Sequence, residues 1–287
     1  MALTQTRTLP KTSAAEDVVT EFRMTDEEFQ RISSLVFSTC GIVLKPHKRQ
    51  MIYTRLARRL RALGMSSFTA YLDLLESRAG AAEQEEFANA VTTNLTSFFR
   101  ESHHFDHLRD EVLAPTAIGT GRPRLRLWSA GCSTGEEPYS IALTALASKA
   151  ADRADLRVLA TDLDTKVLAR AKAGVYAADR VADLSSDMRA ALIRKGGEVQ
   201  MPLSARQLIA FRRLNLLHDW PFAGPFDAIF CRNVLIYFDA ETKAALVERF
   251  ARMLTPQGVL YLGHSESLLG EHPLLLSEGR TIYRRRR

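Results

Sequence analysis

Hydrophobic positions repeat at helical spacing through the first third of the chain. The segment "TDEEFQRISSLVFSTCG" opens with a threonine cap and early acidic residues and stops at Gly41. The segment "KRQMIYTRLARRLRALG" repeats apolar residues at near-helical spacing, namely Ile52, Leu56, Leu60 and Leu63. "SSFTAYLDLLESR" and "EQEEFANAVTTNL" are amphipathic in the same way. These patterns predict a small helical domain over 22–93.

After "FFRESHHF" short apolar runs alternate with amphipathic helical segments. The runs are "RLRLWSAG", "LRVLATD", "FDAIFCRN" and "GVLYLGH", and the helices between them are "EEPYSIALTALASKA", "TKVLARAKAGVY" and "DAETKAALVERFARML". This alternation predicts an α/β domain with a parallel sheet that is covered on both faces. Ligands of such sheets bind at the carboxyl ends of the strands. Polar or small residues stand at these ends: Gly131, Asp162, Asn233 and His264.

Composition narrows the class of protein. The chain has 287 residues, 46% hydrophobic and 25% charged, which is ordinary for a globular protein of more than one domain. No apolar run is long enough to cross a bilayer, and residues 1–21 are polar, without the apolar stretch of a signal peptide. Three widely spaced cysteines suit neither a disulfide framework nor a zinc site. We expect a disordered tail over 1–21 and a reducing, cytoplasmic location.

The net charge of +6 is unevenly placed. No acidic residue occurs from Phe29 through Leu72. Lys45, Lys48, Arg49, Arg55, Arg58, Arg59 and Arg61 all fall in that interval, as does Arg31. A surface of one sign attracts an anionic partner, which could be a nucleic acid, a membrane or an acidic protein face.

The stretch "WSAGCSTGEE" fits two kinds of site. It satisfies G-x-S-x-G, the elbow that presents a hydrolase's nucleophilic serine, which would be Ser133. Asp162 or Asp227 with His264 could complete a triad. However, no HGGG-type oxyanion segment precedes the turn, and the two glutamates that follow it would repel a developing oxyanion. The hydrolase interpretation is therefore disfavoured, and Ser133 is predicted to be no nucleophile.

A cofactor loop explains more of the stretch. Asp162, just past the second strand, can accept hydrogen bonds from both ribose hydroxyls of an adenosine. A pyrophosphate would be repelled by Glu136 and Glu137 at the helix N-terminus, where phosphates normally bind. A cationic adenosine derivative without phosphate, such as S-adenosylmethionine, fits this position. The alternative is that both glutamates only complement the helix dipole, and for Glu136 it stays open.

Several long motifs, in order, resemble the CheR family of chemotaxis-receptor methyltransferases. The resemblance runs from about Thr25 to Tyr283 and includes "KRQMIYTRLARRLRALG", "TTNLTSFFRE", "WSAGCSTGEEPYSIA", "ATDLDTKVLARA", "PFDAIFCRNVLIYFD" and "LGHSESL". One departure is Gly131-Cys132, where some relatives carry alanines. Members of this family methylate glutamate side chains on the cytoplasmic domain of chemoreceptors. The cofactor implied is S-adenosylmethionine, with S-adenosylhomocysteine as product and no metal.

The resemblance also implies how the chain is divided. A helical receptor-docking domain over 22–93 and an interdomain segment over 94–104 precede a methyltransferase domain over 105–287. The last is expected to have the Rossmann-type methyltransferase fold with a small antiparallel β-subdomain inserted at about 178–213. That insertion fits the strand-like pieces of "VQMPLSARQLIAFRR".

Site residues follow from the same resemblance. Those implied to contact the cofactor are Asn94, Thr96, Arg100, Gly131, Glu137, Asp162, Asn215, Leu216, Arg232 and Asn233. Arg100 and Tyr237 are the implied catalytic residues, and the alternative for Tyr237 is a half-buried core tyrosine. Arg55, Arg58 and Arg59 are predicted to dock the receptor rather than to hold the fold.

The implied partner is the helical bundle of a chemoreceptor's cytoplasmic domain. We expect a monomer with no nucleic-acid partner and no membrane insertion. Two other classes stay open: a nucleic-acid methyltransferase, although no reader motif supports it, and a cofactor-binding regulator that no longer catalyses.

Peptide capture is a further property of some members of the family. Their β-subdomain binds a pentapeptide at the receptor's C-terminus through a longer glycine-containing loop. Here the connection "IRKGGEVQMP" is shorter, and Pro202 removes a backbone donor from a nearby strand. We therefore expect no binding of the pentapeptide.

Overall fold

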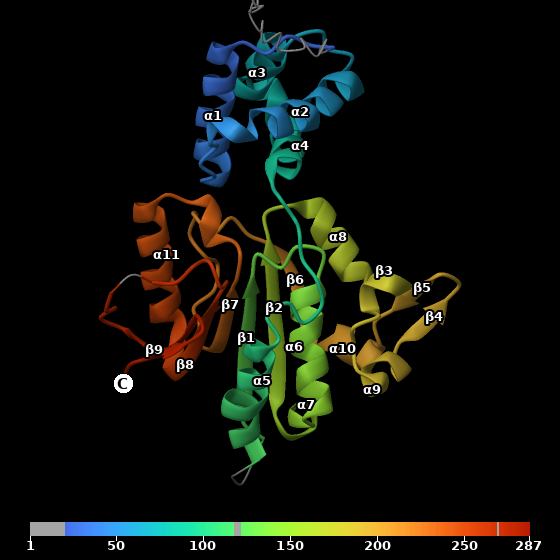
Figure 1. Ribbon diagram of the computed structural model, residues 1–287, viewed down its shortest axis with the longest axis vertical. Helices are drawn as coiled ribbons and strands as arrows, with labels where there is room; N and C mark the ends of the chain where they lie inside the picture. Colours follow the sequence, from blue (N-terminus) through green and yellow to red (C-terminus); the bar gives the residue numbers. More distant parts are fainter. Residues whose placement is uncertain (1–20, 118–121, 269) are drawn as a thin grey trace, which may run out of the picture.

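The computed structural model describes residues 21–117, 122–268 and 270–287. A helical domain lies over one end of an α/β domain, and a small three-stranded sheet projects from the side of the latter (Figure 1). The predicted N-terminal tail lies outside the described residues except for Glu21. In the part of the chain that is described, no helix combines the length and the apolar character needed to span a bilayer.

Four helices form the N-terminal domain: α1 (Asp26–Cys40), α2 (Arg49–Leu63), α3 (Phe68–Glu76) and α4 (Ala81–Val91). The predicted cap of α1 is confirmed, because Thr25 and Glu28 form a reciprocal capping box. Gly41 ends the helix in the left-handed region at φ 70°. Three residues of the apolar stripe predicted for α2, Ile52, Leu56 and Leu60, are buried inside the domain, whereas Leu63 at the end of the helix is 40% exposed.

The arginines of α2 differ in what they contact. Arg59 forms a bidentate ion pair with Glu83, which is only 8% exposed and also accepts a hydrogen bond from the Tyr71 hydroxyl at 2.8 Å. Arg55 donates to carbonyls at the end of α4, at 2.6 Å for that of Thr92. A cation at a helix C-terminus is favoured by the helix dipole. Arg58 is exposed.

The expectation that these three arginines do not hold the fold is therefore wrong for two of them, whereas their docking role stays a prediction. Arg55 and Arg59 hold helices of the domain together, because their guanidinium groups are used by α4. The pattern of charges could not show this, since both partners lie 24 or more residues away in the sequence.

The α/β domain is built on a seven-stranded sheet of order β6-β2-β1-β7-β8-β10-β9. Its strands are β1 (Arg124–Ala130), β2 (Asp155–Asp162), β6 (Ile209–Arg213), β7 (Phe226–Cys231), β8 (Leu254–Leu262), β9 (Leu275–Gly279) and β10 (Ile282–Arg285). The first five strands in that order are parallel, and β10 runs antiparallel to both of its neighbours. The parallel part has the 3-2-1-4-5 order of doubly wound folds. The predicted α/β fold class is confirmed.

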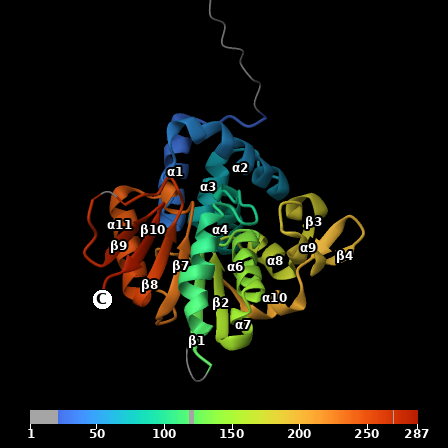
Figure 2. The ribbon, with the colours of Figure 1, turned by 60° about the horizontal axis from the view of Figure 1, so that its bottom comes forward.

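Helices cover both faces of this sheet (Figure 2). The helices of this domain are α5 (His103–His107), α6 (Glu136–Ala147), α7 (Ala150–Arg153), α8 (Thr165–Ala173), α9 (Ser186–Ala190), α10 (Leu203–Leu208) and α11 (Ala240–Met253). Of these, α9 lies beside the small three-stranded sheet (Figure 1). Side chains of β1 alternate between the faces: Trp128 packs with Phe250 of α11, whereas Leu127 packs with Ile141 of α6. This two-sided burial explains the continuous apolar runs in the sequence.

The small antiparallel sheet comprises β3 (Val175–Ala177), β4 (Ile193–Lys195) and β5 (Glu198–Gln200), in the order β3-β5-β4. The predicted insertion at 178–213 differs from it at both ends. The sheet begins at β3, and the segment after β5 forms α10 and then β6, which pairs with β2 in the main sheet. Ile209 and Phe211 of β6 pack beside Ala160 and Leu168. Strand-like pattern alone does not tell which sheet a strand joins, and Pro202 precedes α10 rather than lying in a strand.

The contacts of α2 generate a stability prediction. Arg59→Ala leaves the buried Glu83 carboxylate without its counter-ion and should lower the free energy of unfolding by about 1–3 kcal/mol. Arg58→Ala is the matched control and should change it by less than about 0.5 kcal/mol. Urea unfolding followed by circular dichroism measures both. Equal losses in the two variants would contradict the assignment.

Candidate active site

A cavity of about 280 Å³ opens at the carboxyl edge of the parallel strands. It is lined by both domains, since Cys40 and Ile42 of the helical domain form part of its wall. The eleven residues predicted for cofactor binding and catalysis all line it: Asn94, Thr96, Arg100, Gly131, Glu137, Asp162, Asn215, Leu216, Arg232, Asn233 and Tyr237. The structure thus brings together residues from segments that are far apart in the sequence.

The turn after β1 shapes one wall of the cavity. Gly131 has φ 89°, and a Cβ at this position would clash with Cγ2 of Val234. Ser133 is also left-handed, at φ 49°. Its backbone N–H donates to Asp162 Oδ2 at 2.8 Å, and its hydroxyl donates to the carbonyl of Asn94 at 2.9 Å. The turn therefore connects strands β1 and β2 with the segment between the domains.

The hydrolase alternative gains no support from these contacts. The hydroxyl of Ser133 is used by a backbone carbonyl. His264 interacts instead with Glu101, at 3.1 Å between Nδ1 and Oε1, and Asp227 accepts the backbone N–H of Arg126 at 2.8 Å. Within the described ranges, no hydrogen bond joins His264 to Ser133, Asp162 or Asp227, as a triad would need.

Asp162 ends β2 with its carboxylate at the cavity. Oδ1 accepts the backbone N–H of Asp164 at 3.0 Å, and Oδ2 accepts that of Ser133. Burial raises the pKa of Asp162 to about 6, although these hydrogen bonds act in the opposite direction. Each carboxylate oxygen has a second lone pair, so the group can accept further hydrogen bonds. It is mostly ionised at neutral pH.

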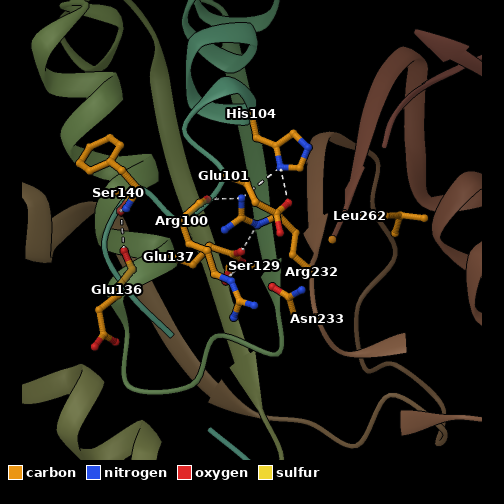
Figure 3. Close-up of polar contacts among 12 residues, drawn as sticks. Arg100, Glu101, His104, Ser129, Glu136, Glu137, Ser140, Arg232, Asn233 and Leu262 are labelled. Atoms are coloured by element: carbon orange, nitrogen blue, oxygen red, sulfur yellow. Dashed lines mark hydrogen bonds and ion pairs between the residues drawn. The ribbon is translucent and has the colours of Figure 1, made fainter. Parts of the chain in front are cut away.

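Glu137 and Arg232 form a buried ion pair in the wall of the cavity (Figure 3). Glu137 Oε2 accepts from Arg232 Nε at 2.8 Å, while Oε1 accepts from the hydroxyl of Ser129 at 2.7 Å. The two side chains are 9% and 3% exposed. The cation compensates the buried carboxylate, which lets an acidic residue occupy the first turn of α6.

Glu136 has different surroundings. It is 1% exposed and forms an ion pair with Arg180, which lies in the short 3₁₀ helix Ala178–Val181 beside the small sheet. Its other carboxylate oxygen accepts from the hydroxyl of Thr134 at 2.6 Å. Glu136 is not among the residues that line the cavity. Its contacts are therefore internal to the protein, which agrees with the alternative that Glu136 does not contact the cofactor.

The segment between the domains reaches the site with several polar groups already paired. The Asn94 amide donates to Asp164 Oδ2 at 2.8 Å, and the carbonyl of Thr96 accepts from Arg180 at 2.7 Å. Arg100 is half-buried and donates to the carbonyl of Leu95 at 3.1 Å. These contacts hold the segment across the strand ends.

The loop after β6 connects the site with the helical domain. The amide of Asn215 donates to the carbonyl of Thr39 at 2.9 Å, and its Oδ1 accepts the backbone N–H of Leu217 at 3.0 Å. The carbonyl of Leu216 accepts from the indole of Trp220 at 3.2 Å. The loop is thus held on both sides of the predicted adenine position.

Glu266 supports the site without lining the cavity, and no role was predicted for it from the sequence. It is 7% exposed and accepts the backbone N–H groups of Gly263, Asn233 and Ile236 at 2.7, 2.8 and 3.0 Å. It thereby holds Asn233 in the left-handed region at φ 58° and the turn that leads to Tyr237. The motif "LGHSESL", just past β8, was the only signal for it in the sequence.

Tyr237 ends the 3₁₀ turn Leu235–Tyr237 and is half-buried at the cavity. Burial raises the pKa of its hydroxyl, so the group is protonated at neutral pH and can donate a hydrogen bond. The backbone carbonyl of Tyr237 accepts the N–H of Val43 at 2.9 Å, which joins this turn to the helical domain.

This sheet, with a glycine turn after β1 and a carboxylate at the end of β2, has the features of a Rossmann-type domain that binds an adenosine-containing cofactor. The profile for the CheR methyltransferase, SAM binding domain, matches residues 94–282, and that for the CheR methyltransferase, all-alpha domain, matches residues 27–92. The chain belongs to the CheR methyltransferase family.

Curated relatives agree with this assignment over nearly the whole chain. Chemotaxis protein methyltransferase 2 of Pseudomonas aeruginosa is 43% identical over 269 residues, which cover 92% of this chain and 94% of the relative. The chemotaxis protein methyltransferase of Escherichia coli is 40% identical over 286 residues, 97% of this chain and 98% of the relative. That of Klebsiella aerogenes is 44% identical, with 94% and 93% covered.

The position of Asp162 yields a prediction on cofactor affinity. Charge-assisted hydrogen bonds contribute about 1.5–3 kcal/mol each, so Asp162→Ala should weaken binding of S-adenosylmethionine by about tenfold or more. Asp162→Asn, which keeps the shape and one oxygen, should lose less. Calorimetry on folded protein measures both. Unchanged affinity in Asp162→Ala would remove the ribose assignment.

The raised pKa of Asp162 predicts a pH dependence. Ribose hydroxyls donate to the ionised carboxylate, so binding favours the charged form and lowers its pKa. Affinity should therefore be constant above about pH 7 and should fall as pH decreases through about 6. Calorimetric titrations at several pH values from about 5 to about 8, which bracket the pKa of Asp162, measure how the affinity changes with pH. In Asp162→Asn the slope should be absent.

The contacts of Ser133 yield a prediction on its reactivity. Ser133→Ala loses one hydrogen bond to a backbone carbonyl, worth about 0.5–1.5 kcal/mol, and should retain substantial methyl transfer. The protein should not react covalently with fluorophosphonate probes. Stoichiometric labelling of Ser133, detected by mass spectrometry, would restore the hydrolase.

Proposed function

We propose that this chain transfers a methyl group from S-adenosylmethionine to glutamate side chains on the cytoplasmic helical bundle of chemoreceptors. The products are glutamate methyl esters and S-adenosylhomocysteine. Membership of the CheR family supports the methyl transfer, and the names of the relatives support the link to chemotaxis. The observation that carries the proposal is the convergence of the eleven predicted residues on one cavity at the strand ends.

The lining residues fit the proposed cofactor. Asp162 offers a carboxylate to the ribose, while Asn215 and Leu216 lie in the loop assigned to the adenine. The ion pair of Glu137 and Arg232 offers both signs of charge to the ends of a zwitterionic amino acid. When bound, S-adenosylmethionine supplies a methyl group on a positively charged sulfur, which is a good leaving group.

The acceptor side needs little acid–base catalysis. A glutamate is already ionised at neutral pH, so one of its oxygens can form the bond to the methyl carbon while sulfur keeps the electrons of the broken bond. The protein must orient the carboxylate and remove its water. Arg100 is the proposed orienting cation, and the protonated hydroxyl of Tyr237 is the proposed hydrogen-bond donor.

We propose that the receptor contacts the exposed face of α2. Arg58 is exposed there, whereas Arg55 and Arg59 are bound within the helical domain. Charge reversal at Arg58 should therefore lower receptor methylation with little change in cofactor affinity. The same internal contacts leave fewer cations for phosphate groups, which disfavours the nucleic-acid methyltransferase alternative.

We also propose that the small sheet does not bind the receptor's C-terminal pentapeptide. β4 and β5 have three residues each and are joined only by Gly196-Gly197, so the hairpin offers few main-chain groups for an added strand. Pro202 does not remove a donor from a strand of this sheet, because it lies at the start of α10. Titrating the free pentapeptide tests the proposal, and saturable micromolar binding at this sheet would contradict it.

Radiolabelled S-adenosylmethionine and receptor cytoplasmic fragments test the function and the two catalytic residues together. Arg100→Ala should lower kcat by about tenfold to a hundredfold, since it removes a charged hydrogen-bond donor. Tyr237→Phe should lower kcat less, because it removes one neutral hydrogen bond. Arg109→Ala, on the exposed surface of the same domain, is the control. Wild-type protein that binds the cofactor but labels no receptor fragment would contradict the proposal and would favour a cofactor-binding regulator that does not catalyse.

A further inference from the structure

His104 is a buried histidine that lies behind the site rather than in it. It is fully buried at the start of α5 and does not line the cavity. Its Nδ1 lies 3.0 Å from Nη1 of Arg232 (Figure 3), and its Nε2 lies 3.1 Å from the carbonyl oxygen of Arg280. Both ring nitrogens are therefore used, by groups 128 and 176 residues away in the sequence.

The nearest partner of each ring nitrogen determines where the proton lies. A guanidinium group only donates hydrogen bonds, so Nδ1, at 3.0 Å from Arg232, is the unprotonated acceptor, and the Glu101 carboxylate lies farther from it, at 3.5 Å. The carbonyl of Arg280 only accepts, so Nε2 must carry the proton. Burial and the neighbouring charge of Arg232 lower the pKa of His104 to about 4, which agrees with a neutral ring. His104 thus connects two groups: it donates a hydrogen bond to the carbonyl of Arg280 and accepts one from the guanidinium of Arg232.

The cation that His104 holds makes two further contacts at the cavity. Nη1 of Arg232 donates to the carbonyl of Arg100 at 2.6 Å, and Nε donates to Glu137 Oε2 at 2.8 Å. The guanidinium also lies over the ring of Phe105, at 5.3 Å from its centroid. Arg232 therefore connects Glu137 at the start of α6 with the backbone of the proposed catalytic arginine.

The other end of the connector is the turn between β9 and β10. Arg280 and Thr281 both have left-handed backbones there, at φ 49° and 62°. The hydroxyl of Thr281 donates to the carbonyl of Leu262 at 2.8 Å, which ties the turn to the end of β8. The turn is fixed by the antiparallel end of the sheet, so it presents the Arg280 carbonyl to His104 in a fixed place.

We propose that His104 is a positioning residue for the methyl-transfer site: it locks the Arg232 guanidinium, through which it orients Glu137 and the backbone of Arg100. This inference rests on the proposed function for the identity of the cofactor. Its support lies in an unbroken set of hydrogen bonds from the β9–β10 turn to the cavity wall. A histidine that only filled space would not need both ring nitrogens matched to partners of opposite kind.

Two substitutions separate the roles of the ring nitrogens. In His104→Asn the side-chain oxygen can stand near the position of Nδ1 and accept from Arg232, whereas the donor to Arg280 is lost. In His104→Gln the amide can stand near Nε2 and donate to Arg280, whereas the acceptor for Arg232 is lost. We expect His104→Gln to weaken binding of S-adenosylhomocysteine by about tenfold or more, and His104→Asn to weaken it clearly less.

His103→Gln is the matched control. His103 also contacts the carbonyl of Arg280, at 3.2 Å, but no hydrogen bond joins it to Arg232 among the described residues. Its affinity for S-adenosylhomocysteine should stay within about twofold of wild type. Calorimetry on the full chain measures all the variants, and thermal melting shows how much stability each has lost.

A double-mutant cycle tests the route of the effect. If His104 acts through Arg232 on Glu137, His104→Gln should cost little additional affinity in a Glu137→Gln background. Fully additive losses would overturn the inference, as would equal losses in His104→Asn and His104→Gln that follow their melting temperatures. The affinity for S-adenosylhomocysteine is measured without receptor. A failure to methylate glutamate would therefore refute the proposed function without changing the outcome for His104.

Discussion

The buried ion pair between Glu137 and Arg232 is the interaction on which the site depends. Taking two charges out of water is costly, and removing one partner of such a pair leaves the other uncompensated. The structure meets this constraint by giving each group further hydrogen bonds, from Ser129 to the carboxylate and from the guanidinium to the carbonyl of Arg100. Strand β7, the start of α6 and the interdomain segment must therefore keep one relative arrangement for the pair to remain satisfied.

The same arrangement explains why the helical domain is part of the site. Asn215 bonds the carbonyl of Thr39, and the carbonyl of Tyr237 accepts the N–H of Val43, so two loops of the α/β domain are held by the chain around the end of α1. Asp164 caps α8 and also accepts from Asn94 of the interdomain segment. A cavity closed by both domains excludes more water than an open strand edge, which suits the proposed methylation of a carboxylate.

Local patterns predicted the features that depend on neighbours in the sequence. The cap at Thr25, the apolar face of α2, and the positions of Gly131 and Asp162 at strand ends follow from spacing and residue type. Long-range pairing was not predictable in this way. The partner of β6, the internal ion pair of Arg59 and the roles of Glu266 and His104 each join segments that no periodicity relates. Family resemblance added the identity of the cavity residues, but it said nothing about what holds them.

The proposed function requires that the cavity esterifies glutamate carboxylates. Mass spectrometry of a receptor cytoplasmic fragment, after incubation with the protein and S-adenosylmethionine, detects such esters. We predict glutamate residues that each gain the mass of one methylene group and that lose it in mild base with release of methanol, as a carboxyl ester does. A base-stable methyl group on another residue type, or none on a fragment that the protein binds, would contradict the account.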